Sequence, residues 1–220
     1  MSILSKYTIL QKIRENKITF SPELDKFQIQ PHTIDLRLGY SFYVPKKWEY
    51  NEKGRIALNS DYLDTDKDSQ NNFDLIKLKP GQYFELLPKE FIISSSLEKI
   101  FLNSDNIMAN LDARSSIMRR GLWVTSGTID VRYQGSLTFP IVNHTEQIIK
   151  LFPGERICHL TFLYIDESIK DEDALLHGNA QSKYYESTPY SLESRTDSLE
   201  EINLIKSGNI DKIKSEYKIF

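Results

Sequence analysis

Four short segments of this chain combine charged, hydroxyl or aromatic side chains with apolar runs that are typical of buried strands. The segments are QPHTIDLRLG at residues 30–39, LDARSSIMRRGL at 111–122, GTIDVRYQG at 127–135 and LFPGERICHLTFLYI at 151–165. Guanidinium and hydroxyl groups suit phosphate oxygens, a carboxylate can orient a water, and an aromatic ring can stack on a base or a sugar. Each segment also has a purely structural alternative.

The second segment is suited to binding phosphate. Arg114 precedes Ser115 and Ser116, and Arg119 follows them. Two hydroxyls and their backbone N–H groups beside a guanidinium can together hold phosphate oxygens. Basic turns with serine are also common on protein surfaces, so a solvated turn is the alternative interpretation.

The third segment has the most specific pattern. Asp130 follows an apolar strand, Tyr133 comes three residues later, and glycines bracket the turn. A carboxylate at the end of a strand can orient a water as general base or hold a sugar hydroxyl, and the tyrosine can stack on the sugar or base. The alternative is a β-hairpin with an aspartate turn residue and a packed tyrosine.

The polar residues of the first and fourth segments have good structural explanations. Asp35 lies among alternating leucines, which is best explained by a buried pair with an arginine from elsewhere in the chain. Arg37 is equally well explained as an edge or surface residue. Arg156 and His159 are functional candidates, although a single histidine on a strand is more often a hydrogen-bonded core or edge residue.

Short β-type pieces separated by turn signals run from Phe27 to about Tyr164. Many short strands with alternating patterning favour a sandwich or barrel over βαβ units. Residues 5–16 precede them with apolar side chains at helical spacing. We therefore predict an all-β fold over residues 1–165, a distorted β-barrel or jelly roll with a short N-terminal helix. Within it, the polar segment 49–72 predicts a surface loop or flexible insertion.

The β pattern stops after residue 165. Residues 166–196 are polar, carry no apolar stripe and predict an arm or lid. Ser198 and Glu201 then have the spacing of a capping box, and a broken apolar stripe follows. We therefore predict a helical C-terminal extension over residues 197–220.

Composition limits the kinds of site and partner. The net charge is -3, whereas a protein that grips long DNA or RNA usually carries a basic surplus, so we expect no nucleic-acid polymer as partner. Cys158 is the single cysteine and the four histidines lack metal-ligand spacing, so we expect no zinc and no protein-built metal site. The absence of a long apolar stretch and of a signal-peptide core predicts a cytoplasmic protein with no membrane partner.

Taken in order, the four segments resemble the dUTPase/dCTP deaminase superfamily. GTIDVRYQG matches its pattern G-x-I-D-x-x-Y-x-G, and PGERI followed by a strand matches its next motif. The leading helix, IQPHTIDLRLG, the KPGQYF turn and WVTSGTID sit where the dCTP deaminase branch has them, including its bifunctional dCTP deaminase/dUTPase members. The resemblance covers roughly residues 3–195.

The resemblance implies a homotrimer of distorted β-barrels with active sites at subunit interfaces, which binds dUTP or dCTP with Mg²⁺ on the triphosphate. It implies catalytic roles for Asp130, Ser115 and Arg119, with Asp130 orienting the water that attacks the α-phosphate. His159 takes the place of a glutamine that helps to hold this water. Substrate contacts are implied for Arg114, Ser116, Ser126, Gly127, Tyr133, Lys183 and Tyr184.

One departure from the deaminase pattern decides which chemistry we expect. That branch uses a glutamate as proton shuttle in a strand pattern I-x-L-E-x-x-N, and this position falls on Pro140 in GSLTFPIVN. Proline has no titratable group, and Glu146 lies six residues further on in a predicted turn. Phosphate-ester hydrolysis needs only a positioned water and neutralised phosphates. We therefore expect a dUTP diphosphatase, which gives dUMP and pyrophosphate.

Two alternatives stay open. The first is a zinc-independent dCTP deaminase with an unusual proton shuttle, and the second is a non-catalytic member that binds a nucleotide or a protein partner. The glycine-rich C-terminal motif of dUTPases is absent, which weakens the preferred function. The preference for uracil, cytosine or a modified base depends on the surroundings of residues 124–127 and is left open.

Overall fold

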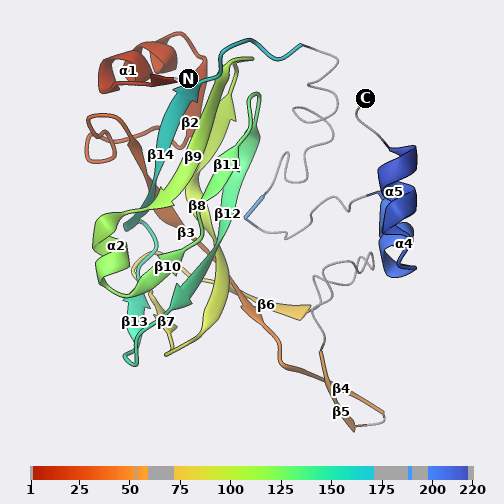
Figure 1. Cartoon of the computed structure of the whole chain (residues 1–220). Helices are drawn as coiled ribbons and strands as arrows, with labels where there is room; N and C mark the ends of the chain where they lie inside the picture. The colour runs from red at the N-terminus through yellow and green to blue at the C-terminus, as the bar shows by residue number, and fades with distance from the viewer. Residues whose placement is uncertain (1, 53, 59–71, 171–187, 190–197, 218–220) are drawn as a thin grey trace.

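Figure 1 shows a computed structural model of the chain, which describes residues 2–52, 54–58, 72–170, 188–189 and 198–217. Strands dominate this part of the chain, and the helices are short. The elements in chain order are β1 (Ser2–Ile3), α1 (Lys6–Arg14), β2 (Ile18–Ser21), β3 (Ile34–Pro45), β4 (Trp48–Asn51), β5 (Gly54–Ala57), β6 (Phe73–Lys77), β7 (Phe84–Leu86), β8 (Phe91–Leu102), β9 (Ile107–Ala113), α2 (Ser115–Arg119), β10 (Leu122–Val124), β11 (Gly127–Ile129), β12 (Gln134–Asn143), β13 (Ile149–Leu151), β14 (Arg156–Tyr164), α4 (Leu199–Lys206) and α5 (Ile210–Glu216).

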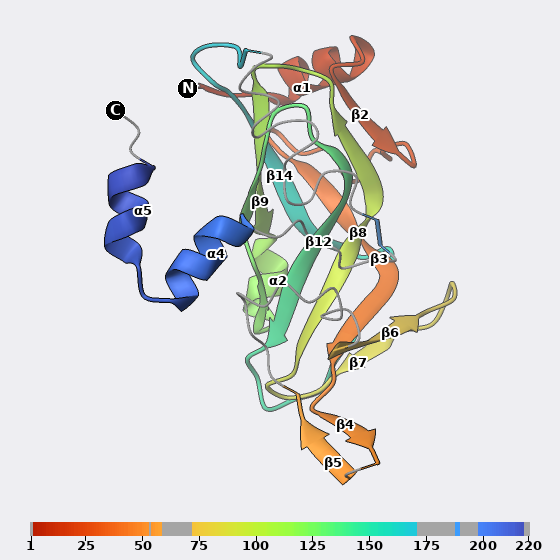
Figure 2. The same cartoon turned by 90° about the vertical axis from the view of Figure 1, so that its right-hand side faces the viewer.

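Most strands belong to one antiparallel sheet with the order β10-β12-β8-β3-β14-β9-β11. The strands at the two ends of this order, β10 and β11, are consecutive in the chain, and only Thr125 and Ser126 connect them. Two residues can bridge the ends of a seven-strand path only if the sheet curls round on itself. Figures 1 and 2 show this curl. The predicted all-β barrel with an N-terminal helix is therefore confirmed.

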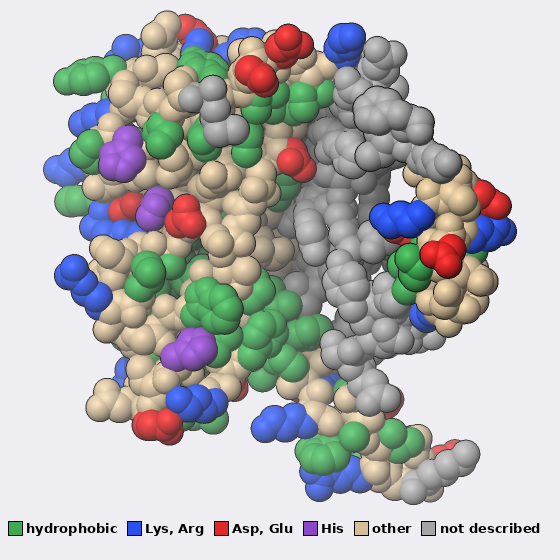
Figure 3. Space-filling model, viewed as in Figure 1, with side chains coloured by type: hydrophobic (Ala, Val, Ile, Leu, Met, Phe, Trp, Pro, Cys, Tyr) green, Lys and Arg blue, Asp and Glu red, His purple; other side chains and the backbone are tan. Residues whose placement is uncertain are grey.

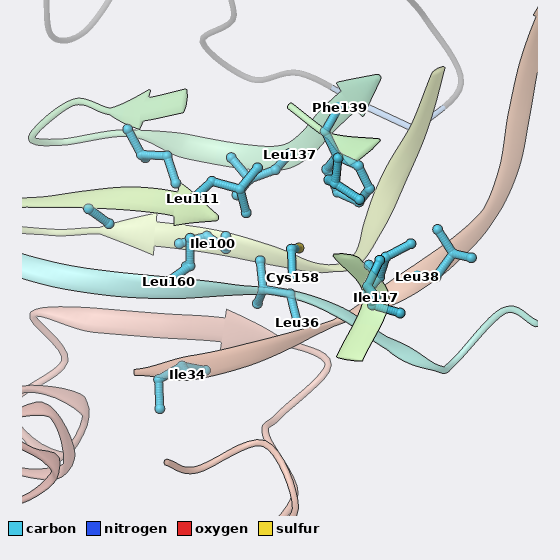
Figure 4. Packing of buried hydrophobic residues seen from close by; sticks show 14 of the residues in the cluster. Ile34, Leu36, Leu38, Ile100, Leu111, Ile117, Leu137, Phe139, Cys158 and Leu160 are labelled. Atoms are coloured by element: carbon cyan, nitrogen blue, oxygen red, sulfur yellow. The ribbon is translucent and has the colours of Figure 1, made fainter. Parts of the chain in front are cut away.

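Period-2 alternation fills the interior of the barrel. On β3, Leu36 and Leu38 are fully buried, and on β14 Cys158 and Leu160 are fully buried as well. Figure 4 shows these side chains gathered side by side on one face of the two neighbouring strands, among the other buried residues of the core. Successive side chains of a strand face opposite sides, so Asp35, between Ile34 and Leu36, and His159, between Cys158 and Leu160, face away from this interior. Asp35 is nevertheless buried.

The N-terminal helix α1 covers one end of the barrel (Figure 1). Ser5 is its N-cap, and its hydroxyl accepts a hydrogen bond from the Thr8 backbone N–H. Ile9 is fully buried and anchors the helix on the core. The prediction of a short helix within residues 5–16 is confirmed.

The prediction of a surface loop or flexible insertion over residues 49–72 is wrong about the loop for its first part, which forms strands on the surface. Strands β4 and β5 form a hairpin that projects from the barrel in Figures 1 and 2, and all its strand residues are exposed. The Arg55 guanidinium lies 3.4 Å from the centre of the Trp48 ring, and such a cation–π contact stabilises an exposed hairpin. Gly54 at the turn has φ of +108°, a conformation that glycine adopts readily. Residues 59–71 lie outside the described part of the chain.

The C-terminal extension consists of α4 and α5, with Gly208 between them at φ +75°. The predicted helices are therefore present. The capping box is not: the Ser198 side chain makes no hydrogen bond to the first turn of α4. Among the described helices, none has the length and apolarity that a membrane span requires.

Candidate active site

Helix α2 follows the end of β9 and presents polar side chains outward. Ile117 is buried and fixes the helix on the core, as Figure 4 shows. Ser115, Ser116 and Arg119 are exposed. The helix therefore offers two hydroxyls and a guanidinium to a ligand, in agreement with the phosphate-binding prediction, which itself stays a prediction.

Asp35 fixes the start of α2 through an ion pair with Arg114, the N-cap residue of this helix. Its carboxylate is 4% exposed, and its Oδ2 atom lies 3.0 Å from Arg114 Nε and 3.1 Å from Arg156 Nη1. Arg114 Nη1 also donates to the Arg156 carbonyl at 2.9 Å. Burial raises the pKa of Asp35, and the two arginines oppose this shift. The predicted buried pair of Asp35 with an arginine is therefore confirmed, with two arginines in place of one.

This network changes the expected role of Arg114. It is the N-cap residue of α2, and two of its donor atoms are committed to Asp35 and Arg156. Within this chain, Arg114 therefore positions the helix that carries Ser115 and Ser116. Contact between its remaining nitrogen and a phosphate stays a prediction.

Arg37 has a structural role. Its Nε and Nη2 atoms donate to Asp25 Oδ2 at 3.0 and 2.8 Å, and Nη1 donates to the Gly154 carbonyl. These bonds connect the start of β3 to the turn before β14. The fork of the guanidinium is thus occupied by structural partners.

His159 lies on β14 between Asp35 of β3 and Asp112 of β9 in the sheet register. It is half-buried, and burial lowers its pKa while the two aspartates oppose this shift. A neutral imidazole is therefore favoured at neutral pH. Its place on the sheet is next to the α2 end of β9, several residues away from Asp130.

The third motif forms β11 and the turn that follows it. Asp130 is exposed, and the Tyr133 backbone N–H donates to the Asp130 carbonyl at 3.3 Å. Tyr133 is buried, and its hydroxyl donates to the Ser136 carbonyl at 2.9 Å. The turn and the packed tyrosine of the structural alternative are present, but its β-hairpin is not, because β11 pairs with β9 whereas β12 pairs with β10 and β8. Packing of Tyr133 against a deoxyribose stays a prediction.

Ser126 and Gly127 lie at the start of β11 and are exposed. A Cβ added to Gly127 would meet no atom within 4 Å, so packing within the chain does not require a glycine here. The neighbouring Thr125 backbone N–H donates to the Pro140 carbonyl at 3.1 Å. Gly127 pairs with Leu111 of β9, so only the outward side of this backbone is free of packing, and its predicted contact with the base stays a prediction.

Within one chain, the Asp130 turn and α2 are not brought together. Ile129 pairs with Ala109 of β9, and Ser115 follows Ala109 by six residues. At about 3.3 Å per residue of extended chain, the turn and the start of the helix are roughly 15–20 Å apart. Lys183 and Tyr184, the predicted lid residues, lie outside the described residues.

Pro140 lies in the middle of β12, opposite Ile93 of β8, at the position where the deaminase pattern has glutamate.

Sequence reasoning missed another carboxylate, Glu98 on β8. It is buried, and it accepts hydrogen bonds from Gln28 Nε2 at 2.7 Å and from the Arg37 backbone N–H at 3.0 Å. The alternation of β8 is the signal that could have revealed it, because Glu98 has the same parity as the buried residues Ile100 and Leu102. Among the described residues, no three or more His, Cys, Asp or Glu side chains gather in a way that could hold a metal ion.

The curled antiparallel sheet and the motifs on β3, α2, β11 and β14 define a barrel of the dUTPase-like type. The chain belongs to the dCTP deaminase-like family, whose model matches residues 3–164. The predicted membership of the dUTPase/dCTP deaminase superfamily, closest to its dCTP deaminase branch, is thereby confirmed.

Individual relatives agree with this assignment. The chain is 35% identical over 164 residues to "dCTP deaminase, dUMP-forming" of Dictyoglomus turgidum, covering 73% of this chain and 79% of the relative. It is 33% identical over 187 residues to the protein of the same name from Dictyoglomus thermophilum, covering 83% and 89%. A crystal structure of 2'-deoxycytidine 5'-triphosphate deaminase from Agrobacterium tumefaciens has a similar fold, with a TM-score of 0.56 at 23% identity. That match covers 80% of this chain and 52% of the other, so this chain spans about half its length.

Proposed function

We propose that this chain is an enzyme that forms dUMP from a pyrimidine deoxynucleoside triphosphate, with dCTP as its substrate. The observation that carries this proposal is its relation to curated proteins named "dCTP deaminase, dUMP-forming", at 33–35% identity over 73–83% of the chain. These names support the deaminase alternative better than the dUTP diphosphatase that we preferred from the sequence.

The step from dUTP to dUMP is the one that this chain's residues support most directly. A water oxygen attacks the α-phosphorus, the bond from that phosphorus to the bridging oxygen breaks, and pyrophosphate leaves. The exposed carboxylate of Asp130 orients this water and accepts its proton. Ser115, Ser116 and Arg119, exposed together on α2, hold the phosphate oxygens.

Magnesium is proposed to enter with the nucleotide. Mg²⁺ in nucleotide sites is usually held by substrate phosphates, several waters and one or two carboxylates, so it needs no protein-built cage. This fits the described residues, which lack a metal-binding cluster but include the exposed carboxylate of Asp130. The bound ion would neutralise charge on the phosphates.

A second candidate function is dUTP hydrolysis without deamination. Deamination requires protons to pass from the attacking water to the departing ammonia, and a titratable group has to carry them. Pro140 occupies the shuttle position and cannot do so. This residue is the specific observation that favours a dUTP diphosphatase.

The site is proposed to form between copies of the chain in a homotrimer. The separation of Asp130 from α2 within one chain supports this arrangement, because a second copy can bring its own α2 to the Asp130 turn. Apolar side chains also gather on the face seen in Figure 3, and the exposed hydrophobic residues include Met118 of α2 and Trp123 of β10, at 61% and 59% exposure. Exposed apolar patches commonly mark interaction surfaces.

The test is to incubate the purified chain with dCTP or dUTP and Mg²⁺ and to resolve the products by chromatography. Formation of dUMP from dCTP supports the main proposal. Formation of dUMP from dUTP alone, with dCTP unchanged, supports the second candidate and contradicts the first. Tight nucleotide binding without turnover of either substrate contradicts both and favours a non-catalytic member.

A further inference from the structure

The turn that carries Asp130 contains an arginine in a backbone conformation that favours glycine. Arg132 has φ of +60°, in the left-handed region. The hydrogen bond from the Tyr133 N–H to the Asp130 carbonyl makes Arg132 the third residue of a four-residue turn. A turn with positive φ at its third position selects glycine or asparagine, because a Cβ is strained there. Arg132 is therefore held in this conformation by something other than its own preference.

An ion pair with the β8–β9 connection holds Arg132. Its Nε atom lies 2.5 Å from Asp105 Oδ1, and its side chain is only 18% exposed. The Asp105 backbone is fixed in turn, because its carbonyl accepts from the Ile169 N–H at 3.0 Å. The Leu102 N–H donates to the Tyr133 carbonyl at 2.8 Å, so the turn and the connection are also joined through their backbones.

We propose that the Asp105–Arg132 ion pair is a positioning device that sets the direction of the Asp130 carboxylate toward the nucleotide. Arg132 is two residues from Asp130 within the same four-residue turn, so a change in its backbone conformation rotates the peptide units on which Asp130 and Tyr133 are mounted. Asp105 and Arg132 are positioning residues and touch no substrate in this proposal. It rests on the proposed role of Asp130 in dUMP formation.

The Asp105–Arg132 ion pair is better explained by the turn conformation that it fixes than by a contribution to the free energy of folding. Asp105 is 51% exposed, and ion pairs with an exposed partner contribute little to the free energy of folding. The positive φ of Arg132 works against folding, and glycine at this position would remove that cost. Strained residues that persist in this way are concentrated at functional sites.

The experiment compares Arg132→Gly, Asp105→Asn and the double variant with the wild-type chain. Arg132→Gly accepts the positive φ but removes the guanidinium, whereas Asp105→Asn keeps the shape of the side chain and removes its charge. Asp74→Asn is the matched control, because it removes an exposed partner of Lys46, 3.6 Å away on the edge strand β6. The measurements are Tm, kcat and KM for dUTP, and hydrogen exchange at the amides of residues 130–134.

We expect Arg132→Gly to keep or raise Tm while it lowers kcat at least tenfold, because glycine reaches many φ values and, without the ion pair, no longer holds the turn and Asp130 in one conformation. KM should change less than threefold, since the phosphate contacts are on α2. Asp105→Asn should give a similar loss of kcat, and the double variant should be no worse than Arg132→Gly, because the two residues act as one unit. The amides of residues 130–134 should exchange faster in both single variants and at the wild-type rate in Asp74→Asn.

Three results would overturn the proposal: kcat within twofold of wild type in Arg132→Gly, multiplied losses in the double variant, or a fall in kcat that follows a fall in Tm. If the wild-type chain turns over neither nucleotide, the proposed function fails. In that case hydrogen exchange still tests the positioning role. Unchanged exchange rates at the amides of residues 130–134 in the single variants would contradict it.

Discussion

Substitution of Gly127 by alanine should weaken nucleotide binding without destabilising the fold. An added Cβ meets no atom within 4 Å, and Gly127 is not among the glycines with positive φ. Alanine at such a position reduces the entropy of the unfolded chain, which stabilises the fold by about 0.4–1 kcal/mol. If the base lies against the backbone of residues 126–127, the same methyl group occupies space that the ligand needs. A clash costing about 1.4 kcal/mol then raises Kd about tenfold.

The assay for Gly127→Ala combines a thermal melt with isothermal titration of a non-hydrolysable dUTP analogue in Mg²⁺. We expect an unchanged or slightly higher Tm and a Kd raised about tenfold. An unchanged Kd would show that the base does not approach this backbone, and the assignment of residues 126 and 127 to substrate binding would then be wrong.

Gly39→Ala is the matched control for this experiment. Its added Cβ would lie 2.7 Å from Ser95 Oγ and 2.9 Å from the Ser95 carbonyl oxygen, which is closer than packed atoms tolerate. Overpacking of this kind costs about 1–3 kcal/mol, so this variant should lose stability. The two substitutions should therefore change Tm in opposite directions, because the Cβ added at Gly39 meets the core and the Cβ added at Gly127 meets open space.

Three further predictions test the site and its surroundings. Asp130→Asn should lower kcat for dUTP hydrolysis about 100-fold or more while Tm and the mass in solution stay unchanged, and persisting activity would exclude Asp130 as the base that orients the water. If the site is shared between copies, unfolding and refolding an equimolar mixture of the inactive variants Asp130→Asn and Arg119→Ala should regenerate about a quarter of the sites, since each site then needs one intact group from each of two chains. Mixed trimers without any activity would contradict a shared site. Burial raises the pKa of Glu98 above its ordinary value of 4.5, so the native state binds more protons than the unfolded state between 4.5 and the higher folded value. The free energy of unfolding should therefore fall as pH rises through this window, and Glu98→Gln should flatten the fall in urea titrations; an identical pH profile in the variant would refute this assignment.

Several features of this protein could be predicted from the sequence because they depend on local patterns. Alternation of apolar and polar residues determined which side chains fill the barrel, and helical spacing at residues 5–16 predicted α1. An aspartate among buried leucines predicted that Asp35 has an arginine partner, since an unpaired buried charge is too costly. Linked motifs identified the superfamily, and Pro140 marked the departure from the deaminase pattern.

Only the tertiary structure decided which groups meet. Asp35 and Arg156 are 121 residues apart, and no local pattern sets the register that joins their strands. The register between β9 and β11 likewise separates the Asp130 turn from α2, although both carry motifs of one expected site. The pairing of Asp105 with Arg132 follows from the meeting of two turns at one end of the barrel. Long-range pairing depends on how the whole sheet curls, and a residue's neighbours in sequence do not contain that information.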